Sequence, residues 1–187
     1  MGAHTIIQPY INSIERGSIV EIGSVRESIE TSSTTYFFEL SKLLNKNFYS
    51  VDIGERRYTK AKSIIGNNAF QLKGEEFLKD FNEEISILYL DNFDIIYNES
   101  HKKSLLNRVG NDYSDLDLEL NIEQSQLAHL TQFQLSEKLL HEDSFVIIDD
   151  TWFDDQWKGK GGTLVPYMLS KGWNILKQNH NHLILKK

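Results

Sequence analysis

Residues 18–24 read SIVEIGS, an apolar run that ends in an acidic residue, a glycine and a serine. A run of this kind is typical of a buried β-strand followed by a tight turn, where the glycine lets the backbone approach a ligand closely. We therefore expect a first strand at Ser18–Ile22. Similar short β-rich runs follow along the chain at Phe48–Asp52, Ala69–Lys73, Ile85–Leu90 and Ser144–Ile148.

The segments between these runs carry apolar residues at three- and four-residue spacing, which is the period of a helix that packs one face on a core. The segments are Ser33–Leu44, Arg56–Ile65, Glu75–Phe81 and Gln124–Leu140, with further helices expected at Ile7–Arg16 and Thr163–Lys171. Alternation of strands and helices predicts a parallel sheet covered by helices on both faces. At the end of the chain, Trp173–Gln178 and His182–Lys186 flank a short polar stretch and predict a hairpin.

The amino-acid composition excludes several kinds of functional site and argues against two kinds of partner. The chain has 187 residues, a formal net charge of −7 and no cysteine, which excludes disulfide frameworks, thiolate metal sites and cysteine nucleophiles. An acidic chain is not expected to bind nucleic acid backbones, and no apolar run is long enough to cross a bilayer. We expect one cytoplasmic domain over residues 1–187, with no nucleic acid or membrane partner; a homodimer is an oligomeric state that the sequence leaves open.

Acidic residues or glycines follow each of the five predicted strands. In an open parallel sheet, ligands bind at the carboxyl ends of the strands, near the point where the strand order reverses. The residues at these ends are therefore the first candidates for a binding site. They are Glu21, Gly23 and Ser24 after the first strand, Asp52 after the second, Gly74 and Glu75 after the third, Asp91 after the fourth, and Asp149 and Asp150 after the fifth.

These residues resemble the class I S-adenosylmethionine (SAM)-dependent methyltransferases. The resemblance lies in Val20-Glu21-Ile22-Gly23, in Asp52, in Leu90-Asp91 and in the terminal hairpin. It implies a doubly wound, Rossmann-like α/β sheet of about seven strands, mostly parallel, with an antiparallel strand from the C-terminal hairpin. The run from Ser125 through His129 to Ile147-Ile148-Asp149-Asp150 looks like the small-molecule O-methyltransferase branch.

The resemblance also implies roles for individual residues in SAM binding. Glu21 would contact the methionine end of SAM, and Gly23 and Ser24 would approach it through their backbone. Asp52 would hold the ribose hydroxyls, and Asp91 would face the cofactor. Gly74 and Glu75 would border the adenine; the alternative for this pair is a simple helix start, where Glu75 is favourable at the positive N-terminus.

Our hypothesis is that Asp91, Asp149 and His129 carry catalysis. Asp91, Asp149 and Asp150 would supply oxygen ligands for Mg²⁺ or another divalent cation, which would orient an acceptor hydroxyl. Alternatively, Asp149 or Asp150 begins the next turn and Asp91 only faces the cofactor. His129 has a suitable ordinary pKa for a general base, although a histidine in the middle of a helix is more often a core-edge residue.

Two segments break the regular alternation of strands and helices. Residues 92–123 form a long polar insertion, expected to be a lid or substrate segment; the alternative is a mobile surface loop. Residues 151–162 hold Trp152, Phe153 and Trp157 beside the run Lys158-Gly159-Lys160-Gly161-Gly162. The spacing does not fit a Walker phosphate loop. We expect instead a flexible substrate loop with two cations and an apolar wall; the alternative is that the aromatic residues only cover the sheet.

The function expected from the sequence is SAM-dependent methyl transfer to an oxygen of a small molecule, such as a sugar or polyol, with or without a divalent metal. An alternative is a catalytically inactive, methyltransferase-like binding or assembly module, because no second glycine follows Gly23 closely. A nicotinamide-dependent oxidoreductase is disfavoured by the same feature, since a dinucleotide pyrophosphate needs a glycine-rich helix start.

Overall fold

The computed structural model describes residues 2–25, 28–92 and 121–187 and forms a seven-stranded sheet in the order β3-β2-β1-β4-β5-β9-β8. The first five strands in sequence run parallel, and β9 is antiparallel to both β5 and β8. This confirms the predicted α/β fold class with an antiparallel strand from the C-terminal hairpin. The strands are β1 (Ser18–Ile22), β2 (Phe48–Val51), β3 (Ala69–Phe70), β4 (Ile85–Leu90), β5 (Leu140–Ile148), β8 (Asn174–Gln178) and β9 (Leu183–Lys186).

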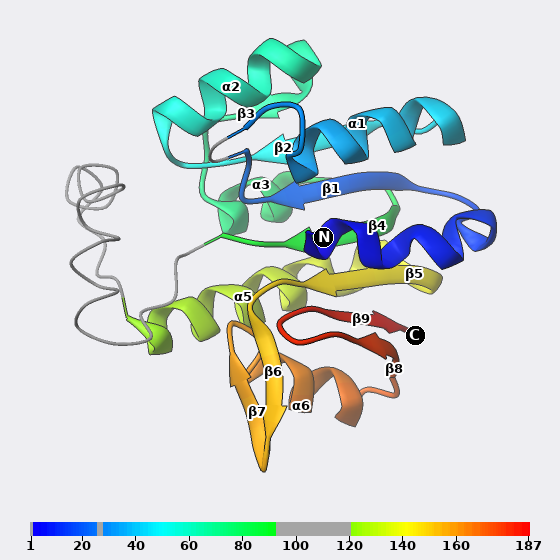
Figure 1. Ribbon diagram of the computed structural model, residues 1–187, viewed down its shortest axis with the longest axis vertical. Coiled ribbons are helices and arrows are strands. Elements are labelled where there is room, and N and C mark those ends of the chain that lie inside the picture. The colour runs from blue at the N-terminus through cyan, green and yellow to red at the C-terminus, as the bar shows by residue number, and fades with distance from the viewer. Residues whose placement is uncertain (1, 26–27, 93–120) are drawn as a thin grey trace.

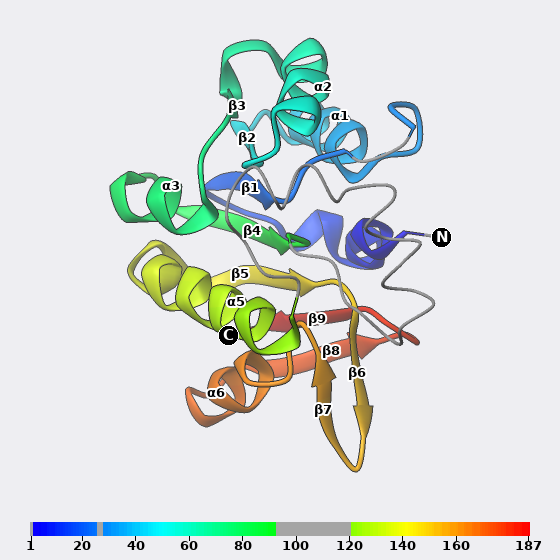
Figure 2. The ribbon, with the colours of Figure 1, turned by 90° about the vertical axis from the view of Figure 1, so that its left-hand side faces the viewer.

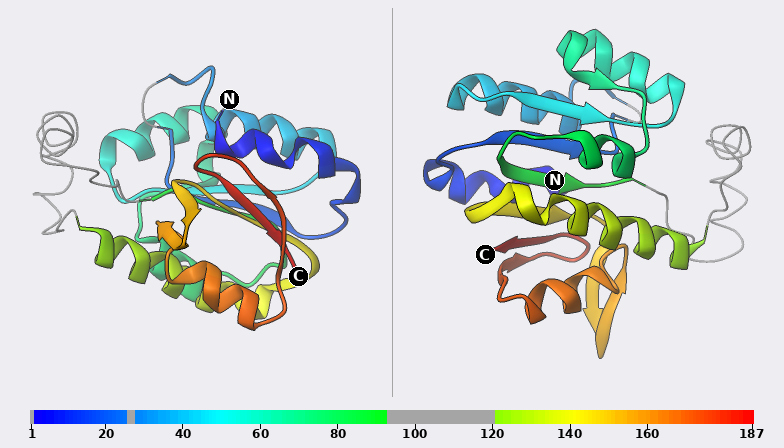
Figure 3. Two further views of the ribbon diagram at one scale, coloured as in Figure 1. Left: turned by 60° about the horizontal axis from the view of Figure 1, so that its bottom comes forward. Right: turned by 180° about the vertical axis from the view of Figure 1, so that it is seen from behind.

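Helices cover both faces of the sheet (Figures 1 and 2). One face is covered by η1 (Ala3–Ser13) and α1 (Ser33–Leu44), with α2 (Glu55–Ile65) packed against α1. The other face is covered by α3 (Gly74–Asp80), α5 (Ile122–Ser136) and α6 (Leu164–Ser170), seen in front of the sheet in the right panel of Figure 3. Among the described residues, no helix combines the length and the apolar character needed to span a bilayer.

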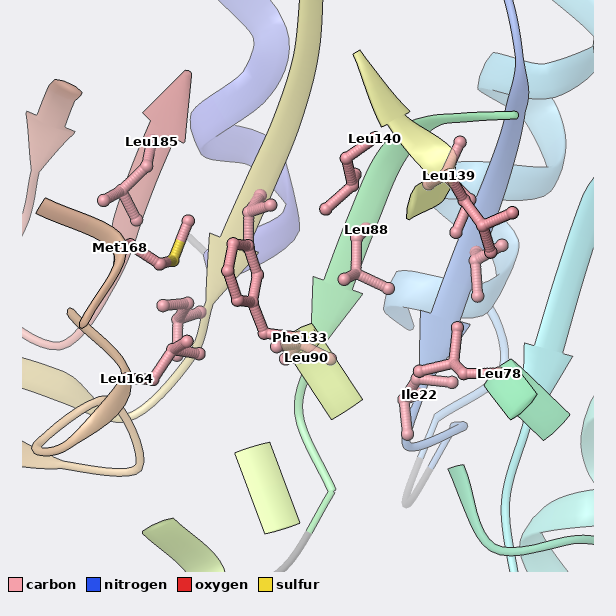
Figure 4. Packing of buried hydrophobic residues seen from close by; sticks show 14 of the residues in the cluster. Ile22, Leu78, Leu88, Leu90, Phe133, Leu139, Leu140, Leu164, Met168 and Leu185 are labelled. Atoms are coloured by element: carbon pink, nitrogen blue, oxygen red, sulfur yellow. The ribbon is translucent and has the colours of Figure 1, made fainter. Parts of the chain in front are cut away.

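Strand alternation divides the buried apolar residues into two layers. Val20 and Ile22 of β1 belong to the layer under α3, α5 and α6, whereas Ile19 belongs to the layer under η1 and α1. β4 and β5 alternate in the same way, because successive side chains of a strand point to opposite faces. Figure 4 shows the first layer, in which Leu88 and Leu90 meet Phe133 of α5. The central strands are thus buried on both faces, as their nearly continuous apolar sequences require.

Some boundaries differ from the sequence prediction. The leading helix is a 3-10 helix that contains Pro9, which has no backbone N–H for a regular α-helix. The helix expected to reach Leu140 ends at Ser136, because Leu140 already pairs with Ile85 as the first residue of β5. β3 is only two residues long. Of the predicted insertion at 92–123, residues 93–120 lie outside the described residues.

Residues 151–162 were expected to be a flexible loop. They contain a hairpin instead. β6 (Thr151–Asp154) pairs with β7 (Gln156–Gly159), and Asp155 at the tip adopts a left-handed φ of 58°. The hairpin projects away from the main sheet in Figures 1 and 2. Its aromatic residues Phe153 and Trp157 pack edge to face with ring centroids 5.2 Å apart, and Phe153 is 54% exposed.

Glu21 is a buried acid within the sheet layer that faces α1. Its Oε2 accepts hydrogen bonds from Thr34 Oγ1 at 2.7 Å and from Ser50 Oγ at 2.5 Å, so it connects β1, β2 and α1. Oε1 is buried without a hydrogen-bond partner. Burial raises the pKa of Glu21 to about 7, and the hydroxyls around it offset only part of that rise.

Glu21→Gln is expected to remove a pH-dependent loss of stability. The ordinary pKa of glutamate is 4.5, so between that pH and about 7 the unfolded chain gives up a proton that the folded chain keeps. Folding stability of the native protein therefore falls as the pH rises through this window and is flat above it. The stability of Glu21→Gln relative to native should rise by up to about 3 kcal/mol across the window. Urea unfolding on both sides of the window measures this difference.

The matched control is Glu142→Gln, because Glu142 is exposed on β5. Its stability should follow the native pH dependence. Parallel pH curves for Glu21→Gln and the native protein would show that Glu21 is ionised in the folded state and would contradict the prediction.

Candidate functional site

A pocket of about 480 Å³ lies at the carboxyl ends of β1 and β2, on the sheet face covered by α3 and α5. It is next to the position where the strand order reverses between β1 and β4, which is where ligands bind in open α/β sheets. The pocket is built by the end of β1, the turn after β2, the start of α3, one residue after β4 and one side of α5. Its lining comprises Ile22, Val51, Asp52, Ile53, Gly54, Arg57, Leu72, Lys73, Gly74, Glu75, Glu76, Asn92, Gln124, Leu127, Ala128 and Thr131.

Asp52 is the buried acid of this pocket, with 6% of its surface exposed. Its two carboxylate oxygens accept backbone N–H groups, from Ser24 to Oδ2 and from Gly54 to Oδ1, both at 2.8 Å. The Arg57 guanidinium lies 3.9 Å from Oδ2. Backbone donors and a guanidinium therefore hold this carboxylate in place at the wall of the pocket.

The walls of the pocket are apolar. Leu72, in the turn before α3, and Leu127, on α5, are 39% and 64% exposed although both are large apolar side chains that line it. Ile22 and Ala128 are buried at the same site. Apolar walls together with polar groups at the edge are typical of a small-molecule site, and a flat ring would remove these leucines from water.

Gly74 and Glu75 lie where the sequence placed them, at the pocket edge. A Cβ on Gly74 would come within 2.5 Å of Ile22 Cγ2, so this glycine allows α3 to approach β1 closely. Glu75 Oε1 accepts a hydrogen bond from Gln132 Nε2 at 3.2 Å. The contact between these two residues and an adenine stays a prediction.

Gly23 and Ser24 form the turn that directly follows β1, beside the pocket. Gly23 has a φ of +98°, and a Cβ there would lie 2.5 Å from the backbone of Asp91. Ser24 donates its N–H to Asp52. Neither lines the pocket, but both hold the turn beside it.

Glu21 does not line the pocket. Residue 21 shares its strand face with Ile19, toward α1, whereas the pocket is on the opposite face with Ile22. The direct contact with the methionine end of SAM that the resemblance implied therefore has no support in this geometry. The physical reason is that successive side chains of a strand point to opposite faces of the sheet, so residues 21 and 22 cannot face the same pocket.

The expected acidic cluster does form, at the carboxyl ends of β4 and β5. Tyr89 Oη donates a hydrogen bond toward Asp91 Oδ2 at 3.2 Å and lies 3.4 Å from Asp149 Oδ2. Burial, with the charge of Asp91 second, raises the pKa of Asp149. Burial also raises the pKa of Tyr89, so this hydroxyl stays protonated.

A lysine ammonium and a histidine imidazole of the protein itself lie next to these carboxylates. Lys160 Nζ lies 2.6 Å from Asp91 Oδ1 and 3.1 Å from Asp150 Oδ2. His182, in the turn between β8 and β9, places Nδ1 2.8 Å from Asp149 Oδ1. This hydrogen bond with Asp149 raises the pKa of His182.

The donor set does not fit the predicted metal site. Among residues 2–25, 28–92 and 121–187, no group of three or more His, Asp or Glu side chains is arranged to hold a metal ion. Asp91 and Asp150, two of the three expected ligands, share the Lys160 ammonium. The structure therefore does not support the Asp91, Asp149 and Asp150 metal site.

His129 is not positioned as a general base. It is fully buried on α5, and its Nδ1 lies 2.6 Å from the Ser125 carbonyl oxygen. Burial lowers its pKa to about 3, with the Lys160 charge as the second cause. A neutral imidazole that a substrate cannot reach is a core residue, as the alternative interpretation had it.

Sequence reasoning missed His182 and Tyr89, and it placed Lys160 in a flexible loop. Tyr89 is on β4 itself, His182 reaches the acidic edge because β9 lies beside β5, and Lys160 reaches it because the β6–β7 hairpin returns to the start of β6. The one sequence signal for His182 was its position at the start of a predicted strand that the fold places next to β5.

Neither a protein-family model nor a curated protein sequence matches the chain. Solved structures do resemble it. TDP-rhamnose 3'-O-methyltransferase CalS11, of calicheamicin biosynthesis, aligns with a TM-score of 0.57 at 11% identity over 98% of this chain and 77% of that chain. A protein from Clostridium thermocellum proposed to be an rRNA methylase aligns at 0.54 and 10%, over 99% of this chain and 96% of that chain.

A third similar structure contains a ligand. It is a SAM-dependent methyltransferase from Bacteroides fragilis in complex with S-adenosyl-L-homocysteine, with a TM-score of 0.50 and 13% identity over 99% of this chain and 76% of that chain. The neighbours include an O-methyltransferase and a proposed RNA methylase, so they do not single out the small-molecule branch. At these identities the likeness concerns the fold, and the chain has the fold of the SAM-dependent methyltransferases.

Proposed function

We propose that this protein binds SAM in the Asp52 pocket and transfers its methyl group to an oxygen of a small molecule. The observation that carries the proposal is a buried aspartate at the end of β2 in the wall of an apolar pocket. A ribose diol would donate hydrogen bonds to the Asp52 carboxylate, and an adenine ring would fit between Leu72 and Leu127. The likeness in fold to a SAM-dependent methyltransferase supports the same assignment.

The geometry is less suited to a nicotinamide dinucleotide. A dinucleotide pyrophosphate binds at a helix N-terminus that follows the first strand through a short glycine-rich turn. Here α1 begins at Ser33, with Ser32 as its cap, well after the turn at Gly23. One of the N-terminal N–H groups of α1 is already used, since Ser32 Oγ accepts from Thr35 N at 3.2 Å.

Methyl transfer requires an acceptor oxygen in line with the methyl carbon and the sulfur. When bound, SAM would supply a sulfonium methyl group: the acceptor oxygen would bond to the methyl carbon as the carbon–sulfur bond breaks, and the sulfur would keep the electron pair. The hydroxyl proton must go to a base. In this proposal the base is His182, whose Nδ1 is held by Asp149 and whose side chain is 22% exposed at the edge of the site. The second ring nitrogen, Nε2, would receive the proton.

A small hydroxyl compound is preferred as the acceptor over nucleic acid. The net charge of −7 does not provide the cationic surface that holds a phosphate backbone. CalS11 is named as a methyltransferase that acts on a sugar hydroxyl, which supports a sugar or polyol here. The second candidate is a module that binds the cofactor and catalyses no transfer, and it is distinguished by the acceptor assay below.

The first test is thermal unfolding with SAM, S-adenosylhomocysteine or NAD, each in large excess. A ligand at about 100 times its Kd stabilises the folded state by roughly 2.7 kcal/mol, which raises the Tm of a chain of this size by about 5–10 °C. We expect this shift with both sulfur compounds and none with NAD. A shift with NAD alone, or with none of the three, would overturn the proposal.

Asp52→Asn is expected to weaken S-adenosylhomocysteine binding by about tenfold or more, because an amide presents one acceptor oxygen in place of two and loses the charge. Isothermal titration calorimetry measures the Kd. Asp80→Asn is the matched control, since Asp80 is exposed at the end of α3. An unchanged Kd for a folded Asp52→Asn protein would show that the ribose is not held there.

His182→Gln is expected to lower the rate of methyl transfer by about 100-fold while leaving the Kd of S-adenosylhomocysteine unchanged. The assay follows radiolabelled methyl transfer from SAM to sugars and polyols, with ribosomal RNA as a parallel acceptor. The native rate should rise with pH as His182 loses its proton, and this rise should be absent in the variant. His180→Gln, on the same hairpin and exposed, is the control. Equal rates for native and His182→Gln would remove His182 as the base.

Cofactor binding with no transfer to any acceptor would favour the binding module. Transfer to ribosomal RNA alone would leave SAM binding intact and overturn the small-molecule part of the proposal.

A further inference from the structure

Lys160 is a buried lysine whose ammonium group lies within the acidic edge of the sheet. Its side chain has no exposed surface, and its Nζ is 2.6 Å from Asp91 Oδ1 and 3.1 Å from Asp150 Oδ2. A buried ammonium is costly unless it is paired and hydrogen-bonded. The two carboxylates supply that pairing, and they come from neighbouring strands, β4 and β5.

The backbone around Lys160 is shaped to place it there. Lys160 N donates to the Asp150 carbonyl oxygen at 3.0 Å, and Gly161 N donates to Thr151 Oγ1 at 2.9 Å. Gly159 has a φ of +77°, and a Cβ at that position would lie 1.9 Å from the Asp150 oxygen. Only glycine therefore permits the close approach that brings the end of β7 back against Asp150.

Each of the three clustered carboxylates has a partner from the protein. Asp91 and Asp150 share Lys160, and Asp149 is bonded to His182 and to its neighbour's backbone N–H. A divalent cation needs several carboxylate oxygens that converge on it. The ammonium group already lies between two of them, and its positive charge would repel a second cation at that distance.

We propose that Lys160 is the built-in cation of this site and takes the place that a divalent metal would occupy between Asp91 and Asp150. Lys160 is a positioning residue: it holds the two carboxylates in a fixed geometry and does not reach the solvent side of the site. The ion-binding part of this proposal is independent of the proposed function. Its catalytic consequence, a methyl transfer that needs no metal, rests on that function.

The test measures Mn²⁺ binding by electron paramagnetic resonance for the native protein, Lys160→Met and Lys158→Met. Lys158→Met is the matched control, because Lys158 is a lysine two positions away that pairs with Asp154 on the hairpin. The native protein and Lys158→Met should show no saturable binding up to millimolar Mn²⁺. Lys160→Met, which removes the ammonium group from between Asp91 and Asp150, should bind Mn²⁺ at least about tenfold more tightly than the native protein.

Thermal unfolding keeps the proposal falsifiable if Lys160→Met folds poorly. Lys160→Met should have a lower Tm, and Lys160→Met/Asp91→Asn should recover part of the loss, because the double variant neutralises one of the two carboxylates that lose the ammonium group. Mn²⁺ should raise the Tm of Lys160→Met and not that of the native or double-variant protein.

Saturable Mn²⁺ binding to the native protein at micromolar concentrations would overturn the proposal. So would Mn²⁺ that neither binds nor stabilises Lys160→Met, because the lysine would then not occupy a cation position. Neither outcome depends on SAM, so failure here is distinguishable from failure of the proposed function, which the S-adenosylhomocysteine measurement tests separately.

Discussion

The parallel pairing of β1 with β4 is the contact on which the rest of the molecule depends. It joins the two halves of the sheet, and on either side of it the strand order runs in opposite directions. The pairing continues past the strands, where Asp91 N donates to the Ile22 carbonyl oxygen at 2.8 Å. Gly23 then passes so close to Asp91 that no side chain fits between them. The pocket and the acidic edge both lie at this junction.

Acidic residues at the ends of the strands have different environments, and their partners decide what each can do. Asp52 is held by backbone N–H groups at the wall of a pocket. Glu21 is surrounded by hydroxyls inside the core, where burial favours its neutral form. Asp91 and Asp150 neutralise a lysine. In a medium of low polarity a charge without compensating groups is costly. The groups around each carboxylate therefore decide whether its charged or its neutral form is favoured.

The sequence predicted the central strands well because their two faces are both apolar, so residues 18–22 and 85–90 could be assigned without knowledge of their neighbours. Asp52 and Gly74 were placed at a pocket because strand ends meet at one sheet edge. The side on which Glu21 points could also have been predicted, since alternation groups it with Ile19. The partners Lys160 and His182 could not, because β9 inserts beside β5 and a hairpin returns to Asp150, and neither pairing has a local signal.

A fixed internal cation changes how an acceptor would be held. A metal ion with open coordination positions orients a substrate by binding its oxygens directly. Lys160 is buried and already bonded to two carboxylates, so it offers no open coordination position to a substrate. Recognition of an acceptor would instead depend on hydrogen bonds to groups at the edge, such as the imidazole of His182. A single, correctly placed hydroxyl would then be sufficient for an acceptor to bind. The shape of the site and its hydrogen bonds would determine which acceptor is selected.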